Sequence, residues 1–352
     1  MTLANAYNAY NQHNQHNAYN QHNQHGADAS GAGSSTLAQA LLLARDAIAP
    51  MGGVAVTKPA PPGLTALERL RRIEPQFAAA ALLSELSEGV QIKASARALT
   101  VSVPGGDLLR LTRPSGKDFR DEAQLVAGYA ELRAERMAEI LSQTGQILPF
   151  FGAVLPLSPG WTPCVMLLTS LVQDMATAMV QRAKLGFSAP RPHVLSPDIQ
   201  PMIDCPGHAA FPSGHATQAF ALSGLLSALN EAKGPDPASP LDRMAARIAV
   251  NRTVAGLHYP SDSAAGAVLG TAVARWLVAR ATGTDVTGLA LDTGKWGSDA
   301  SGGSRDFHLP ALCLAWQKQT CLKQQAALPV ARAPLLAALW QGALREWSRR
   351  WG

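Results

Sequence analysis

The chain has 352 residues, of which 47% are apolar and 16% are charged, a balance that excludes a wholly disordered protein. The 30 Lys and Arg against 25 Asp and Glu give a formal net charge of only +5, and no sustained basic run occurs. This charge does not favour nucleic acid as a partner. The four cysteines lack C-x-x-C spacing, which argues against a zinc knuckle or a disulfide framework and favours a reduced compartment.

The N-terminus is a low-complexity repeat. Residues 5–25 consist of seven NAY or NQH triplets, and a Gly/Ala/Ser-rich stretch follows as far as Ser35. So short and polar a period cannot bury an apolar face, so we expect residues 1–35 to be a disordered tail and linker. Its histidines could capture a metal, but composition favours a tract without a role. No apolar secretory segment occurs, and we expect a soluble, cytoplasmic protein without a signal peptide.

The next part of the chain is predicted to be mainly helical as far as residue 145. Helices are expected from Thr36 to Pro50, over 64–72 and over 75–86. Thr100–Val103 and Leu108–Leu111 alternate across a Pro-Gly-Gly-Asp turn, which predicts one hairpin. A long amphipathic helix is then expected from Asp118 to Gly145.

The second half shows repeated helix-start signals. Ser, Thr and Pro at these starts predict helices over 162–184, 213–232, 239–253 and 261–281, and a terminal helix is expected over 328–351. The Gly/Ser/Asp-rich stretch 285–305 is predicted to be a loop. No stretch offers the roughly 20 uninterrupted apolar residues of a membrane span.

These elements predict an all-α fold: a helical bundle with a central oxyanion site and at most one minor β-hairpin. We expect residues 36–352 to form a single domain with a motif core over 162–282. The alternative is a separate small N-terminal domain that ends near Gly116.

Two short segments carry residues that suit an anion. In the first, Lys184 and Arg191 place two cations at the end of a predicted helix, and Pro192 fixes an extended exit. In the second, Ser213-Gly214-His215 opens an apolar helix, where free backbone N–H groups and the positive dipole end can cradle an oxyanion.

A third segment adds a cation, an imidazole and a carboxylate. Arg252 supplies charge, and Asp262 is spaced to accept a hydrogen bond from one ring nitrogen of His258, leaving the other nitrogen free to attack. Together the three segments would suit a highly charged tetrahedral anion.

With these segments the chain resembles the superfamily that unites type-2 phosphatidic-acid phosphatases, soluble bacterial acid phosphatases and vanadium-dependent haloperoxidases. The family pattern K-x6-RP, PSGH and SR-x5-H-x3-D occurs in order with every internal spacing intact. Asn251 stands where the family usually has Ser, and its amide can still donate a hydrogen bond. The resemblance covers Lys184 to about Gly266.

The resemblance implies roles for these residues. Vanadate or phosphate would lie among five anion-binding residues: Lys184, Arg191, Ser213, Gly214 and Arg252. In the phosphatases, the residue matching His258 attacks phosphorus to form a phosphohistidine, His215 protonates the leaving oxygen, and Asp262 holds His258. In the haloperoxidases, His258 would instead bind vanadate, as the one metal ligand, while His215 handles protons.

The choice between these reactions rests on His208, seven residues before His215. Bromide- and iodide-oxidising members carry a similar histidine at that offset, so we expect a haloperoxidase that uses vanadate, peroxide and halide. The alternatives are a soluble acid phosphatase that hydrolyses phosphomonoesters without vanadate, and a module that binds an anion without turnover. Halide preference and a homo-oligomeric state stay open.

Overall fold

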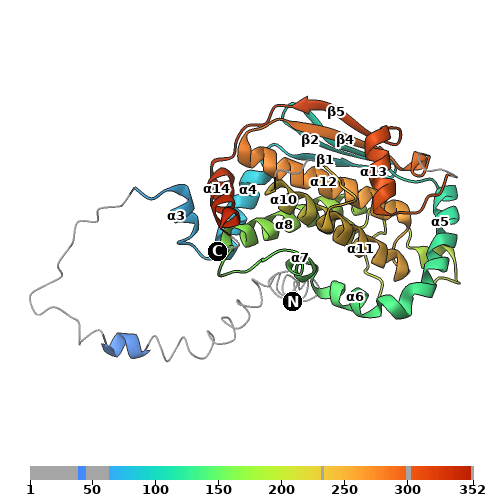
Figure 1. Cartoon of the computed structure of the whole chain (residues 1–352), viewed down its shortest axis with the longest axis horizontal. Coiled ribbons are helices and arrows are strands. Elements are labelled where there is room, and N and C mark those ends of the chain that lie inside the picture. The colour runs from blue at the N-terminus through green and yellow to red at the C-terminus, as the bar shows by residue number, and fades with distance from the viewer. Residues whose placement is uncertain (1–38, 45–62, 231–233, 299–302, 350–352) are drawn as a thin grey trace, which may run out of the picture.

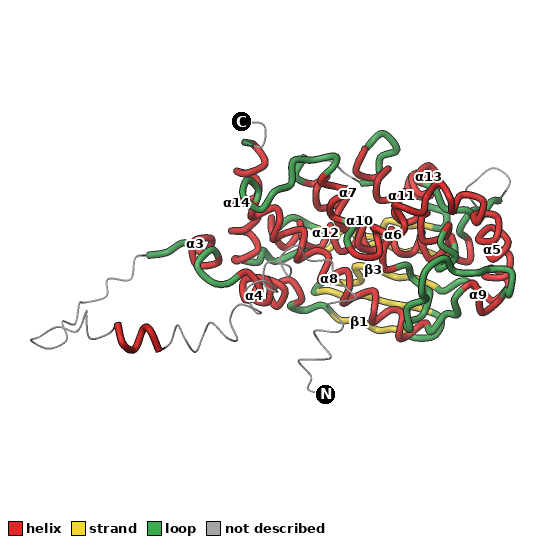
Figure 2. Tube along the Cα trace, turned by 90° about the horizontal axis from the view of Figure 1, so that it is seen from below, coloured by secondary structure: helices red, strands yellow, loops and turns green. Residues whose placement is uncertain are grey.

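The computed structural model describes residues 39–44, 63–230, 234–298 and 303–349. The predicted tail and linker, and most of the helix expected before Pro50, lie outside these residues. The described part has two layers, with a five-stranded sheet over one face of a set of helices (Figure 1). In the view from below, the strands lie behind the helices (Figure 2).

The sheet contradicts the all-α prediction. Its order is β1-β2-β3-β4-β5, and all neighbours are antiparallel except β3 and β4, which are parallel. The strands are β1 (Gln91–Ala94), β2 (Ala98–Val103), β3 (Gly106–Thr112), β4 (Val286–Asp292) and β5 (Leu322–Leu328). The predicted hairpin is present as β2 and β3. An all-α bundle with at most one hairpin is therefore wrong.

Two of the three missed strands, β4 and β5, owe their conformation to pairing with segments outside their own sequence neighbourhood, whereas β1 pairs with the adjacent β2. β4 lies inside the stretch that its Gly, Ser and Asp content predicts to be a loop, yet Leu289 and Leu291 are buried against β3. β5 has the sequence LKQQAAL, with no β-branched residue, and pairs with β4. Pairing across a buried sheet outweighs weak local propensity.

The helices before residue 160 are short and lie at the periphery. They are α3 (Ala66–Leu70), α4 (Pro75–Ser87), α5 (Gly116–Gly128), the 3₁₀ turn η1 (Tyr129–Leu132), α6 (Arg133–Gly145) and α7 (Leu148–Gly152). A capping box between Ser115 and Asp118 starts α5. The single long helix predicted over 118–145 is thus divided at Tyr129–Leu132, and α6 faces the central helices from the side away from the sheet (Figure 1).

The central helices follow the sequence prediction closely. They are α8 (Pro163–Phe187), α10 (Gly214–Ala228), α11 (Pro240–Val254) and α12 (Pro260–Thr282), joined by the short α9 (Pro192–Leu195). Two more helices, α13 (Leu309–Lys318) and α14 (Pro334–Ser348), complete the chain. α14 begins at Pro334, later than the predicted start at residue 328, which is instead the last residue of β5.

Two glycines bring α12 against α10. A Cβ atom at Gly266 would lie 2.6 Å from the carbonyl oxygen of Ser213, and one at Gly270 would lie 2.2 Å from that of Thr217. The backbone N–H of Ser213 also donates to the carbonyl of Asp262 (2.9 Å). The first turns of the two helices are therefore held side by side, with the motif residues at their starts.

The core runs through both layers, and residues from Leu70 to Trp347 contribute to one apolar cluster. One described stretch, Pro163–Leu195, which comprises α8 and α9, is long and apolar enough to cross a membrane, but 67% of its most apolar window is buried inside the protein. A core helix passes the same test, so this is weak evidence for a span, and the absence of a span stays a prediction.

Candidate active site

Six of the nine motif residues line one cavity of about 850 Å³. They are Arg191, His208, Gly214, His215, Arg252 and His258. The residues come from the loops on either side of α9, from the start of α10, from α11 and from the loop before α12. The volume suits a small-molecule site, and the wall is rich in imidazole and guanidinium groups.

His258 and Asp262 form a buried pair at the start of α12. Nδ1–H of His258 donates to Oδ2 of Asp262 (2.9 Å), and the backbone N–H of Tyr259 donates to the same oxygen (3.1 Å). Burial lowers the pKa of His258 well below its ordinary value, and Arg191 and Lys184 lower it further. His258 is therefore neutral at pH 7, and with its proton on Nδ1 its Nε2 carries a lone pair.

Arg191 joins two imidazoles. Its Nη1 lies 3.1 Å from Nε2 of His258, and its Nη2 lies 3.1 Å from Nδ1 of His208. Its guanidinium also donates to the carbonyls of Leu257 and His208. Burial lowers the pKa of His208 to about 4, with a further contribution from Lys184. Both rings thus stay neutral beside a fixed positive charge at pH 7.

Arg252 carries donors that form no hydrogen bond with the described residues. Its Nη2 donates to Oε1 of Gln143 (3.0 Å) and to the carbonyl of Ile140 (3.2 Å). Its Nε and Nη1 are buried without a hydrogen-bond partner in the described part of the chain. Burial lowers the pKa of Arg252 to about 10, so it remains charged at pH 7. A buried guanidinium with unpaired N–H groups on a cavity wall favours an anionic ligand.

Lys184, Ser213 and Asp262 lie behind the cavity wall instead of lining it. Nζ of Lys184 donates to the carbonyls of Ala209 and Ala210 (2.7 Å each), so it fixes the loop before α10. Burial, and then the charge of Arg191, lower the pKa of Lys184. Oγ of Ser213 accepts from the backbone N–H of Ala216 (3.4 Å) and caps α10.

Gln143 is the main site residue that the sequence prediction missed. Its carbonyl accepts from Nε2 of His215 (2.9 Å), and its Oε1 accepts from both Arg252 and Nδ2 of Asn251 (3.1 Å). Asn251 is fully buried and also donates to Glu139 (2.9 Å), so it organises α6 and does not face the cavity. A polar Gln three residues after Ile140, on the buried face of α6, was the available signal.

Glu122 is a second residue that the prediction missed. It accepts from the backbone N–H (3.0 Å) and Oγ (2.7 Å) of Ser261 and pairs with Arg305 (2.7 Å). Burial raises the pKa of this carboxyl, and Arg305 opposes the rise. Glu122 therefore anchors the first turn of α12, which carries Asp262.

The site suits an oxyanion better than a bare metal cation. The described residues contain no group of three or more His, Cys, Asp or Glu that could hold a metal ion. Arg191 and Arg252 line the cavity, and Lys184 lies behind its wall. Asp204 is the acidic residue in the lining, and Asp262 lies behind His258. The unpaired N–H groups of Arg252 and the neutral Nε2 of His258 fit phosphate, or vanadate held by one imidazole.

Comparisons with known proteins point to the same segment. Residues 160–283 match the family model of the PAP2 superfamily. Among the matching solved structures is the "Crystal structure of the first bacterial vanadium dependant iodoperoxidase", at 19% sequence identity and a TM-score of 0.26. That match covers 32% of this chain and 33% of the other chain. No curated protein matches.

Proposed function

The chain carries a PAP2 superfamily region at residues 160–283, and we propose that it is a haloperoxidase of this superfamily that uses a bound vanadate. The reaction would be the two-electron oxidation of bromide or iodide: hydrogen peroxide, halide and one proton give hypohalous acid and water. The observation that supports it is the position of Arg191 between His258 and His208.

The residues would divide the work as follows. Vanadate, when bound, would supply the centre that activates peroxide. His258 would hold it through Nε2, since Asp262 fixes the ring and keeps the proton on Nδ1. Arg191 and Arg252 would neutralise its charge, together with the backbone N–H groups at the start of α10. His215, on the same wall, would donate and accept protons in the cavity.

His208 would set the halide chemistry. Its ring lines the cavity and lies beside Nη2 of Arg191, whereas His258 lies beside Nη1, and its low pKa keeps it neutral at pH 7. A neutral imidazole there can accept a proton or a hydrogen bond without repelling the cations that hold the anion.

The second candidate function is phosphomonoester hydrolysis. The observation that favours it is the His258–Asp262 pair, which is also the geometry of an activated nucleophile, with His215 on the same cavity wall as a proton donor. In this case phosphate replaces vanadate and no cofactor is needed.

Two assays of the purified protein test the proposal. One measures bromination with peroxide, bromide and added vanadate, and the other measures hydrolysis of p-nitrophenyl phosphate. The haloperoxidase proposal predicts vanadate-dependent bromination that collapses in His208→Ala, while vanadate binding followed by calorimetry persists. His193→Ala is the matched control, because His193 lies near the site but outside the cavity lining. Hydrolysis that vanadate inhibits, without bromination, would remove the proposal in favour of the phosphatase.

The third possibility, a module that binds an anion without turnover, is tested with the native chain and with His258→Ala. If the native chain has one of the two activities and His258→Ala loses it, the protein is an enzyme that uses His258. If the native chain binds the anion but has neither activity, the protein is a binding module.

A further inference from the structure

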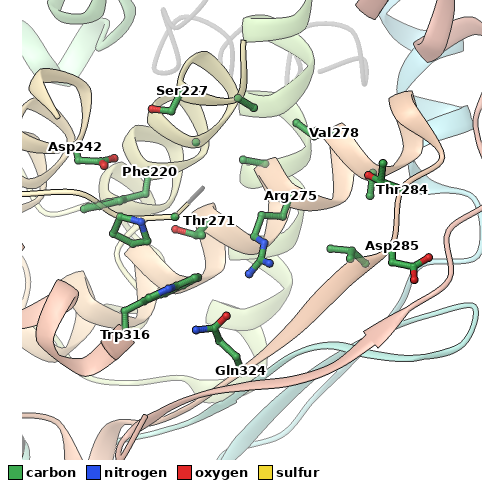
Figure 3. A pocket seen from close by; sticks show the side chains of 17 residues that line it. Phe220, Ser227, Asp242, Thr271, Arg275, Val278, Thr284, Asp285, Trp316 and Gln324 are labelled. Atoms are coloured by element: carbon green, nitrogen blue, oxygen red, sulfur yellow. The ribbon is translucent and has the colours of Figure 1, made fainter. Parts of the chain in front are cut away.

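A second cavity, of about 400 Å³, lies at the far ends of the helices that carry the active site. The active site uses the first turns of α10 and α12, whereas this cavity is lined by later residues of the same helices, among them Ser227 and Val278. The remaining walls come from α11, α13, β4 and β5 and from the loops before α11 and β4 (Figure 3). None of the motif residues reaches it, so the two cavities are separate sites.

Arg275 is the cation among the lining residues. Its side chain points from α12 into the cavity, toward the space between Trp316 and Gln324 (Figure 3). The guanidinium carbon lies 5.6 Å from the centre of the Trp316 ring, which gives a cation–π contact. Nη1 is buried and has no hydrogen-bond partner among the described residues. Burial also lowers the pKa of Arg275, which reflects incomplete compensation of its charge.

Neither carboxylate on the cavity wall neutralises this charge. Asp242 accepts hydrogen bonds from Oγ of Ser223 (2.5 Å) and from the backbone N–H of Asp236 (2.9 Å), so its oxygens are engaged elsewhere. Asp285 is exposed, and within the described ranges it forms no ion pair with Arg275. A partly desolvated guanidinium without an acidic partner is costly, and an anionic ligand would offset that cost.

We propose that this cavity binds a small planar aromatic carboxylate. The carboxylate would take two N–H groups of Arg275 in the parallel geometry that guanidinium favours. The ring would pack on Trp316 and on the apolar side chains of Phe220 and Val278. A volume of about 400 Å³ lies at the small end of ligand sites and suits a single-ring compound.

The walls favour this class over an inorganic anion. Phosphate or sulfate would form an ion pair with Arg275 but would make no favourable contact with Trp316 or with the aliphatic side chains of the wall. A neutral aromatic would gain the apolar contacts but leave Arg275 unpaired. Only a ligand with both parts uses the whole site.

Benzoate is the probe, and benzamide is its neutral counterpart of the same shape. Binding to the full chain is followed through the indole N–H resonance of Trp316, assigned with Trp316→Phe, which reports on this cavity and not on the active site. We expect a saturable shift with benzoate and an affinity at least about tenfold lower for benzamide.

The variants test the part played by Arg275. Arg275→Gln should weaken benzoate binding by about tenfold or more. Arg275→Lys keeps the charge but loses the planar guanidinium group, so its affinity for benzoate should lie between those of Arg275→Gln and the native chain. Arg243→Gln is the matched control, because Arg243 is exposed on α11 and lines neither cavity. Equal affinities for benzoate and benzamide, or no saturable shift of the Trp316 resonance, would overturn the proposal without any variant. Unchanged binding in a folded Arg275→Gln protein would also overturn it.

Discussion

Nδ1 of His258 lies 2.9 Å from Oδ2 of Asp262, four residues further along the chain, in a site where both side chains are buried. Asp262 lies in the first turn of α12, and its other oxygen, Oδ1, has no hydrogen-bond partner among the described residues. The acceptor therefore serves mainly to orient one imidazole and to fix its tautomer.

Asp262→Asn tests this orientation. An amide keeps the shape but presents a group that can donate as well as accept, so the proton of His258 is no longer confined to Nδ1. We expect the rate of whichever reaction the assays detect to fall on the order of 10²- to 10⁴-fold, with the fold retained. Steady-state kinetics and circular dichroism measure the two effects. A folded variant with nearly native activity would contradict the assigned role.

Arg191→Gln tests the electrostatics around His258. Burial and then the charge of Arg191 hold the pKa of this ring below its ordinary value of 6.5. Removal of Arg191 should raise the pKa toward 6.5 without reaching it, because burial remains. NMR titration of the His258 ring in the anion-free protein gives the value. Arg182→Gln, at an exposed position of α8, should leave it unchanged.

Gln143→Leu tests the contribution of α6. This change keeps the carbonyl that accepts from His215 but removes Oε1, which accepts from Arg252 and Asn251. Leaving these buried donors unpaired should cost about 1–3 kcal/mol in the free energy of unfolding and weaken anion binding. Chemical denaturation and calorimetry measure the two quantities.

Gln181→Leu is the matched control for Gln143→Leu. Gln181 lines the same cavity, yet its side chain forms no hydrogen bond within the described ranges. Equal losses in the two variants would show that any apolar replacement in the wall has this effect.

Gly270→Ala tests the contact between α10 and α12. Its Cβ would meet the backbone oxygen of Thr217 at 2.2 Å and the backbone nitrogen of Ala221 at 2.8 Å, so the helices themselves would have to move. We expect a loss of about 1–3 kcal/mol in the free energy of unfolding. Gly128→Ala, in a helical conformation with nothing within 4 Å of its Cβ, should be neutral or slightly stabilising. Equal stability of the two variants would refute the packing argument.

Glu139 should make the stability depend on pH. Hydrogen bonds from Arg247 and Asn251 lower the pKa of its carboxyl to about 2 from an ordinary value of 4.5. The ionised form is favoured by folding, so this stabilisation is complete above pH 4.5 and is lost as the pH falls toward 2. The difference in unfolding free energy between the native chain and Glu139→Gln should shrink over that interval, as measured by denaturant titration. If this difference stayed constant as the pH falls from 4.5 toward 2, the role assigned to Glu139 would be contradicted.

The sequence located the parts of the site that are encoded locally. Ser213, Arg252 and Asp262 lie at helix ends whose caps and prolines are legible within a few residues, and the structure places those helix ends within a few residues of the prediction. The sequence prediction missed Gln143 on α6 and Glu122 on α5 because their partners, Arg252 and Ser261, lie 109 and 139 residues further along the chain. No local pattern reports such contacts.

The prediction of the fold class was wrong for a related reason. The hairpin of β2 and β3 has its own turn and was predicted, whereas β4 and β5 have weak strand signals and depend on each other and on β3. Helices over 64–86 and 162–281 were predicted because amphipathic spacing and caps are local properties. Strand pairing between distant segments is not a local property, so the sequence pattern of one segment does not report it.

The parallel pairing of β3 with β4 also imposes an order of events on a chain that is synthesised from its N-terminus. Thr112 and its partner Asp292 are 180 residues apart, and the helices α5 to α12 lie between them. Until β4 emerges from the ribosome, β3 presents an open edge that another chain could occupy. Closing so long a connection is also slow. The helices that carry the active site therefore leave the ribosome before β4 and β5 can complete the sheet.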